Sequence, residues 1–130
     1  MFRLDEKNRN AIYIQIMENI KEMIVTDVWH ENDKIPSVRE LSEELTLNPN
    51  TVQKAYRELE REGYIYTVSG KGSFVGGKSG IRRDPAMVDE LKNKVREAFR
   101  GLLLLGYNPD EASSIIQGTV IEAAAGMKSD

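Results

Sequence analysis

A stripe of apolar side chains predicts an amphipathic helix between Ala11 and Val28. These side chains recur every three or four residues, the spacing that places them on one face of a helix. The stripe consists of Ile12, Ile16, Ile20, Met23 and Ile24. We expect the helix to end near Asp27, a residue type that tolerates the left-handed backbone conformation found at helix ends.

Two further helices are predicted between residues 36 and 62. Ser37, followed three residues later by Glu40, is the pattern of a capping box at the start of a short helix. Asn48 is a favourable N-cap for the next helix, and Pro49 fits its first turn, where the missing amide hydrogen costs nothing. Gly63 ends that helix. The inward positions are Val38, Leu41 and Leu45 in the first of these helices and Val52, Ala55, Tyr56 and Leu59 in the second.

The chain then changes to a strand pattern. Residues 64–68 and 73–75 are rich in β-branched and aromatic side chains, and the glycine-containing stretch 69–72 is typical of a turn, so a β-hairpin is predicted. The following stretch, Gly76 to Asp84, carries three glycines and almost no apolar pattern. This composition favours a linker.

Two amphipathic helices are predicted after the linker, from Pro85 to about Leu105 and from Pro109 to about Gly126. Two helices alone cannot bury apolar stripes this wide, so a partner surface is expected. The stripe residues assigned to this surface are Leu91, Val95, Phe99, Leu102, Ile115, Ile116 and Val120. The chain is thereby divided into a domain of residues 1–76, a linker of residues 77–84 and a helical segment of residues 85–130.

The composition excludes several classes of protein. The 130 residues are 40% apolar and 30% charged, a balance typical of folded soluble domains. The longest purely apolar run, Leu102 to Leu105, is far shorter than the roughly 18 to 20 residues that span a bilayer, and no signal sequence is visible at the N-terminus, so a cytoplasmic location is expected. With no cysteine and a single histidine, His30, neither a metal nor another cofactor is expected.

The stretch GSFVGGKS, Gly72 to Ser79, matches the letters of the phosphate-binding P-loop. A working P-loop follows a buried strand of a parallel sheet and opens a helix at its Lys-Ser pair. Here the preceding strand is predicted to pair within a hairpin, and Gly80 follows Ser79. No nucleophile, base and orienting group can be assembled either, so we do not expect an enzyme, and nucleotide binding is kept only as an alternative hypothesis.

Three helices followed by a hairpin predict a winged helix-turn-helix, an α+β fold that is mostly α. In this motif the second helix of the pair lies in the DNA major groove, and the hairpin, or wing, reaches the backbone or the minor groove. The outward residues of the predicted third helix are Asn50, Thr51, Gln53, Lys54 and Arg57. Asn and Gln can bond adenine, whereas Lys and Arg neutralise phosphates. Such a face is also typical of plain solvated surface, and the net charge of −3 argues weakly against DNA binding.

The stretch from Lys34 to Val75, KIPSVRELSEELTLNPNTVQKAYRELEREGYIYTVSGKGSFV, resembles the DNA-binding domain of the GntR family of bacterial transcriptional regulators. The resemblance lies in the Pro-Ser-x-Arg start of the second helix, the Asn-Thr-Val start of the third and the Gly-Lys-Gly turn of the hairpin. The short two-helix tail is similar to that of the YtrA-type subfamily, whose members use it for dimerisation. The resemblance implies a homodimeric repressor that binds a pseudo-palindromic DNA operator, with no effector identified.

The resemblance also implies a set of DNA contacts. Arg39 is expected on the DNA backbone, and Gly70 with Lys71 is expected at the tip of the wing. The third-helix positions that match the family pattern are Asn48, Asn50, Thr51 and Gln53. The residues that stand where the family often has glycine are Asp27, Asn32 and Thr46, which leaves the geometry of these turns open. A winged helix that binds only a protein partner is kept as a second alternative.

Overall fold

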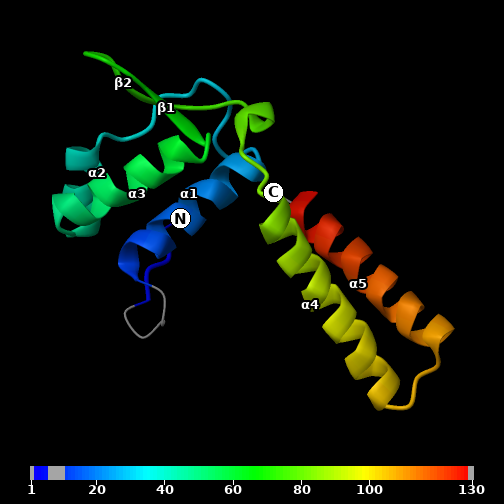
Figure 1. Cartoon of the computed structure of the whole chain (residues 1–130). Helices are drawn as coiled ribbons and strands as arrows, with labels where there is room; N and C mark the ends of the chain where they lie inside the picture. The colour runs from blue at the N-terminus through cyan, green and yellow to red at the C-terminus, as the bar shows by residue number, and fades with distance from the viewer. Residues whose placement is uncertain (1, 6–10, 129–130) are drawn as a thin grey trace. The chain divides into compact units, whose positions relative to one another are not determined.

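The structure, a computed structural model, describes residues 2–5 and 11–128 and contains two compact units, Met1–Arg82 and Arg83–Asp130 (Figure 1). The elements of the first unit are α1 (Ile12–Val25), α2 (Val38–Leu45), α3 (Pro49–Arg61), β1 (Ile65–Val68), β2 (Gly72–Val75) and the 3₁₀ turn η1 (Lys78–Gly80). The elements of the second unit are α4 (Pro85–Leu104) and α5 (Pro109–Lys128). The predicted fold, a winged helix-turn-helix followed by two helices, is confirmed.

The core of the first unit lies where α3 contacts α1, α2 and β1. Its buried side chains are Ile16, Met17, Ile20, Met23, Ile24, Ile35, Leu41, Val52, Ala55, Tyr56, Leu59, Ile65 and Val75. The apolar stripes that predict α1 and α3 are therefore the faces that these helices bury. Trp29, in the segment after α1, is half-buried and packs against the same core.

The helix starts are held by the predicted caps. The amide of Glu40 donates to Ser37 Oγ at 3.0 Å, and the amide of Ser37 donates to Glu40 Oε1 at 3.1 Å, which completes the capping box of α2. At the start of α3, the amide of Asn50 donates to Asn48 Oδ1 at 2.8 Å. Both caps satisfy backbone donors that have no partner within the helix.

The wing contains a third short extended segment that the sequence pattern did not predict. Lys34 forms an antiparallel bridge with Phe74. On either side of this bridge, the amide of Ile35 donates to Ser73 O at 3.0 Å and the amide of Val75 donates to Asp33 O at 2.9 Å. The segment before α2 is thereby bonded to β2, on the edge of β2 that does not pair with β1.

Most of the predicted linker, residues 77–84, belongs to the first unit, so the linker prediction needs correction. The amide of Arg82 donates to Glu62 O at 2.9 Å, and Lys78 Nζ lies 3.0 Å from Asp27 Oδ1. Gly63 has a φ of +88° and is so close to the Gly80 carbonyl that no side chain would fit there. A glycine-rich composition indicated flexibility, but here glycine permits close packing of the backbone.

The second unit is a pair of helices that lie side by side, α4 and α5 (Figure 1). Ala112 is fully buried between them, and Phe99, Leu102 and Ile116 are half-buried. At the start of α5, the amide of Glu111 donates to Asn108 Oδ1 at 2.8 Å. No helix within the described residues combines the length and the apolar character that crossing a bilayer requires.

Candidate nucleic-acid interface

Tyr56 fixes α3 against the segment that precedes α2. Its side chain is 4% exposed, and its hydroxyl donates to Pro36 O at 2.6 Å. Burial raises the pKa of Tyr56, so the hydroxyl stays protonated and keeps donating over the physiological pH range. Val52 and Leu59 are fully buried on the same side of α3. The opposite side of α3 is therefore held outward in a defined orientation.

The outward side of α3 carries most of the residues predicted to contact DNA. The structure places Asn50, Gln53, Lys54 and Arg57 at exposed positions, whereas Thr51 is half-buried. The amide side chains of Asn50 and Gln53 can each present a donor and an acceptor to a base edge. Arg57 lies two turns after Asn50 on the same side and adds a fixed positive charge.

Lys54 points toward α1. Its Nζ lies 4.1 Å from the centroid of the Tyr13 ring, in the geometry of a cation–π contact. The sequence pattern predicts Lys54 at an outward position, and the structure shows that Lys54 is exposed. The pattern does not predict the contact with Tyr13. Any DNA contact of Lys54 would draw its ammonium group away from Tyr13.

Two further predicted contacts lie at the starts of α2 and α3. The side chain of Arg39 is 89% exposed, and its only ion pair among the described residues is a long one, 3.4 Å from Nε to Glu43 Oε1. A pair this exposed contributes little and is easily exchanged for a phosphate. Asn48 uses its side-chain oxygen for the cap of α3, and its side-chain NH₂ group is a hydrogen-bond donor that this cap does not use.

The last turn of α3 is neutralised by its own carboxylates. Arg61 Nη2 lies 2.6 Å from Glu58 Oε2, and this hydrogen bond raises the pKa of the Arg61 guanidinium. Glu60 accepts a hydrogen bond from Thr67 Oγ1 on β1 at 3.2 Å. The positive charge of the α3 surface therefore depends on Lys54 and Arg57, near the middle of the helix.

The predicted wing tip is a tight turn between β1 and β2. The amide of Lys71 donates to Val68 O at 2.9 Å, and Gly70 has a φ of +76°, within the left-handed region. Lys71 is exposed at this turn. Behind the tip, the rings of Tyr66 and Phe74 stack with centroids 5.5 Å apart. The turn thus carries a charged side chain on a stiffened hairpin.

The stretch that matches a P-loop has a different structure. The sheet of the described residues has two antiparallel strands, β1 and β2, and not the parallel order that a P-loop fold requires. Only the short turn η1 begins at Lys78, and the Lys78 ammonium is paired with Asp27. The match in letters does not correspond to a nucleotide site.

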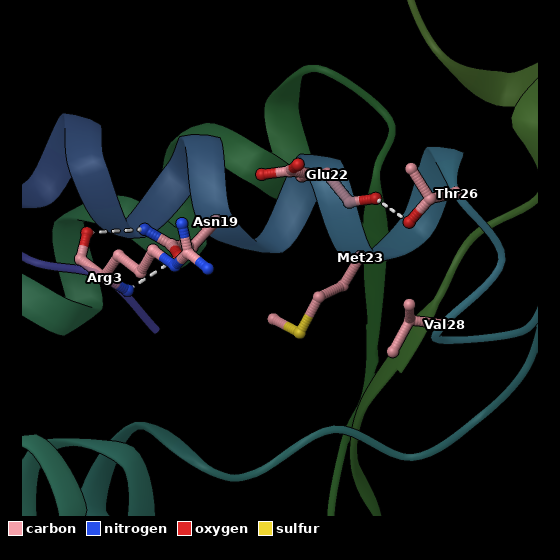
Figure 2. A pocket seen from close by; sticks show the side chains of 6 residues that line it. All are labelled: Arg3, Asn19, Glu22, Met23, Thr26 and Val28. Carbon is pink, nitrogen blue, oxygen red and sulfur yellow. Dashed lines mark hydrogen bonds between the residues drawn. The ribbon is translucent and has the colours of Figure 1, made fainter. Parts of the chain in front are cut away.

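A separate pocket of about 400 Å³ lies along α1 (Figure 2). The residues that line it are Arg3, Asn19, Glu22, Met23, Thr26 and Val28. Two reciprocal hydrogen bonds join Arg3 and Asn19, from Arg3 N to Asn19 Oδ1 at 2.9 Å and from Asn19 Nδ2 to Arg3 O at 3.2 Å. None of the predicted DNA contacts lines this pocket.

The protein is a winged helix-turn-helix DNA-binding transcriptional regulator. Three features define this class: a buried three-helix core, an outward α3 with amide and cationic side chains, and a wing with a lysine at its turn. Residues 12–75 match the family described as bacterial regulatory proteins, gntR family. The chain belongs to the GntR family. Because the members it matches are regulators of transcription, the protein is not an enzyme.

Individual relatives extend the similarity beyond the winged helix. The HTH-type transcriptional repressor YtrA of Bacillus subtilis (strain 168) is 31% identical over 130 residues, which cover all of both chains. A transcriptional antiterminator from Listeria monocytogenes EGD-e has a structure that matches with a TM-score of 0.75 at 37% identity, covering 100% of this chain and 94% of that one. AraR(DBD) in complex with operator ORE1 matches with a TM-score of 0.51 at 29% identity, covering 58% and 93%.

Proposed function

We propose that the protein is a transcriptional repressor that acts in the cytoplasm and binds a pseudo-palindromic DNA operator as a homodimer. The observation that carries this proposal is the outward face of α3, where Asn50, Gln53 and Arg57 are exposed opposite a fully buried face. Two relatives support it: a repressor of the same overall length, and AraR(DBD), whose structure is in complex with an operator.

The apolar surface of α4 and α5 supports the homodimer. Leu91, Val95 and Val120 are 57%, 55% and 61% exposed, and Ile115 is exposed as well. A cleft of about 430 Å³ between the two helices is lined by Val95, Phe99 and Ile116 together with polar neighbours. Surfaces of this kind are typical of protein interfaces. A second copy of the same helices would cover the surface in the symmetric way that a two-fold dimer requires.

The residues divide into two roles by chemistry. Asn50 and Gln53 are assigned to base edges, because their amides can form paired hydrogen bonds to adenine. Arg39, Arg57 and Lys71 are assigned to phosphates, since their charges are exposed and neutralise any sequence alike. A dimer would place two such surfaces on half-sites about one helical turn apart, or a multiple of it.

The test is DNA binding by the full chain, measured by fluorescence anisotropy on the region upstream of its own gene and on unrelated duplexes of equal length. Asn50→Ala should cost on the order of 1 to 3 kcal/mol on the operator and little on unrelated DNA, which lowers specificity. Lys71→Ala should weaken both kinds of DNA alike and reduce the salt dependence.

The protein-interaction alternative predicts a different result. A protein-interaction module would show no preference for the upstream region, and its affinity for DNA would be unchanged in Asn50→Ala. Equal effects of Asn50→Ala and Lys71→Ala on a panel of operator variants would refute the division of roles, even if the protein binds its operator.

A further inference from the structure

Lys34, which lies outside the helix-turn-helix, reaches the wing. Its backbone bridges Phe74 on β2, so its side chain lies on the same face of the sheet as Phe74 and Gly72. If Gly72 carried a Cβ atom, that atom would lie 3.0 Å from Lys34 Cε and 3.7 Å from Lys34 Nζ. The aliphatic part of the lysine therefore crosses Gly72, the residue that directly follows Lys71 in the wing turn.

Glycine at position 72 makes this arrangement possible in two ways. Its φ of +120° lies in a region that other residues rarely adopt. Its missing side chain leaves the space over β2 that Lys34 occupies. The hairpin thus carries two lysines at its tip, Lys71 on the turn itself and Lys34 from the neighbouring segment.

The Lys34 ammonium group is exposed and available. Among the ion pairs of the part of the chain that the structure describes, none includes Lys34. The positive charge of Lys34 has a small effect on the Glu40 carboxylate. The pKa of Glu40 is lowered mainly by hydrogen bonds with Ser37 and only last by the charge of Lys34. Since Ser37 already engages Glu40, this carboxylate does not hold the lysine in place.

We propose that Lys34 is a second phosphate-binding residue of the wing, which contacts the DNA backbone next to Lys71. The inference rests on the DNA-binding role proposed above. A wing that enters or borders the minor groove has phosphates on both sides, and a pair of lysines on one hairpin can neutralise two of them. The contact is sequence-independent, because an ammonium group binds phosphate as a point charge.

The experiment compares Lys34→Ala, Lys34→Arg and Lys92→Ala with the unchanged protein. Lys92 is an exposed lysine on α4, a helix of the second unit, so its replacement makes the same change in net charge without altering the winged helix. Anisotropy titrations on the upstream region and on an unrelated duplex are repeated between about 0.05 and 0.3 M KCl, where one phosphate contact contributes about 0.9 to the slope of log K against log salt. Thermal unfolding confirms that each variant is folded.

Because both subunits of the proposed dimer lose the contact, Lys34→Ala should lower the slope by about 1.8 and the affinity by about 25-fold near 0.15 M salt, on both DNAs. Lys34→Arg and Lys92→Ala should match the unchanged protein. If Lys34→Ala also matches it, the assignment of Lys34 is wrong while the proposed function stands. An unchanged protein that binds neither DNA would overturn the proposed function and this inference together.

Discussion

Among the described residues of the first unit, three residues other than glycine adopt the left-handed backbone conformation. They are Asp27, Asn32 and Thr46, with φ of +62°, +70° and +54°. Asp and Asn visit this region with little cost, and here each side chain has a partner: Lys78 pairs with Asp27, and the Tyr66 hydroxyl donates to Asn32 Oδ1 at 2.8 Å. Threonine is β-branched, so Thr46 is the residue of the three for which this conformation is least favourable.

Thr46→Gly is expected to stabilise the protein. Glycine removes the cost of holding a β-branched residue in the left-handed conformation, about 1 to 2 kcal/mol. Part of this gain is lost because glycine increases the conformational entropy of the unfolded chain. The net rise in the free energy of unfolding should be about 0.5 to 1 kcal/mol. Urea denaturation of the two proteins measures it.

Thr26→Gly is the matched control. Thr26 follows α1 as Thr46 follows α2, but its φ is −95° and its hydroxyl donates to Glu22 O. Glycine there gains nothing in conformation and loses a hydrogen bond, so the free energy of unfolding should fall. If both variants were destabilised alike, the left-handed conformation of Thr46 would not be a source of strain.

Site residues were predicted where a local pattern defines them. Asn48 and the outward positions of α3 follow from helix periodicity and capping, so the sequence predicted their placement. The contacts of Lys34 with Gly72 and of Lys54 with Tyr13 join residues about 40 positions apart. No spacing rule along the chain encodes such pairs, because they depend on how the elements pack.

At the scale of elements, the start of α2 links stability to pH. Glu40 accepts the hydrogen bond from the Ser37 amide, and the hydrogen bonds with Ser37 lower the pKa of its carboxylate below the usual value. A carboxylate with a lowered pKa in the folded state contributes stability above its unfolded pKa. That contribution disappears as the pH falls through the folded pKa.

Glu40→Gln isolates the charge in this effect. Glutamine can occupy the same place in a capping box, so the hydrogen bond remains possible while the charge is lost. At neutral pH the variant should unfold at a lower urea concentration than the unchanged protein. The gap should shrink as the pH is lowered from about 5 to about 3, because Glu40 itself becomes neutral.

Glu44→Gln is the control for this prediction. Glu44 is an exposed carboxylate of the same helix but lies in its last turn, away from the unpaired amides of the start. The Glu44→Gln variant should not show a loss in the free energy of unfolding at neutral pH that disappears at acidic pH. If the difference in urea midpoint between Glu40→Gln and the unchanged protein stays constant with pH, the capping box acts through its hydrogen bonds alone.

Elements with a strong local signal were predicted, and those made by long-range pairing were not. Helices α1 to α5 and the hairpin follow from periodicity, caps and turn residues. The bridge between Lys34 and Phe74 was missed since a single bridge residue has no alternating pattern. Glycine-rich composition predicts a linker over residues 77–84, because glycines are common in flexible chains, whereas Gly80 packs closely against Gly63 and residues 77–82 lie in the first unit.

At the scale of the whole molecule, the net charge of the chain does not indicate whether it can bind DNA. The chain is acidic overall, yet several of its carboxylates already have partners within the fold, such as Glu58 with Arg61 and Glu62 with Lys21. The cations of the wing and of the outward face of α3 are exposed. A local surface can therefore attract DNA although the total is −3, and the salt dependence of binding reports that surface rather than the total.

The proposed homodimer leads to the last prediction, that Val95→Glu separates the subunits without unfolding them. Val95 is 55% exposed in the single chain, so a carboxylate there remains hydrated in the monomer but would be buried in a dimer. Ser114→Glu makes the same charge change at an exposed position of α5 outside the apolar stripe and should leave the dimer intact. Light scattering after size exclusion gives the mass, and circular dichroism gives the melting of the helices.

The same pair of variants connects assembly to DNA binding. A dimer gains affinity because the second half-site binds as an intramolecular step, so Val95→Glu should lose on the order of 100-fold in operator affinity while a single half-site is bound as before. Ser114→Glu should bind the full operator normally. A monomeric Val95→Glu with full operator affinity would show that one chain reads the site alone, and a dimeric Val95→Glu would place the interface elsewhere on the molecule.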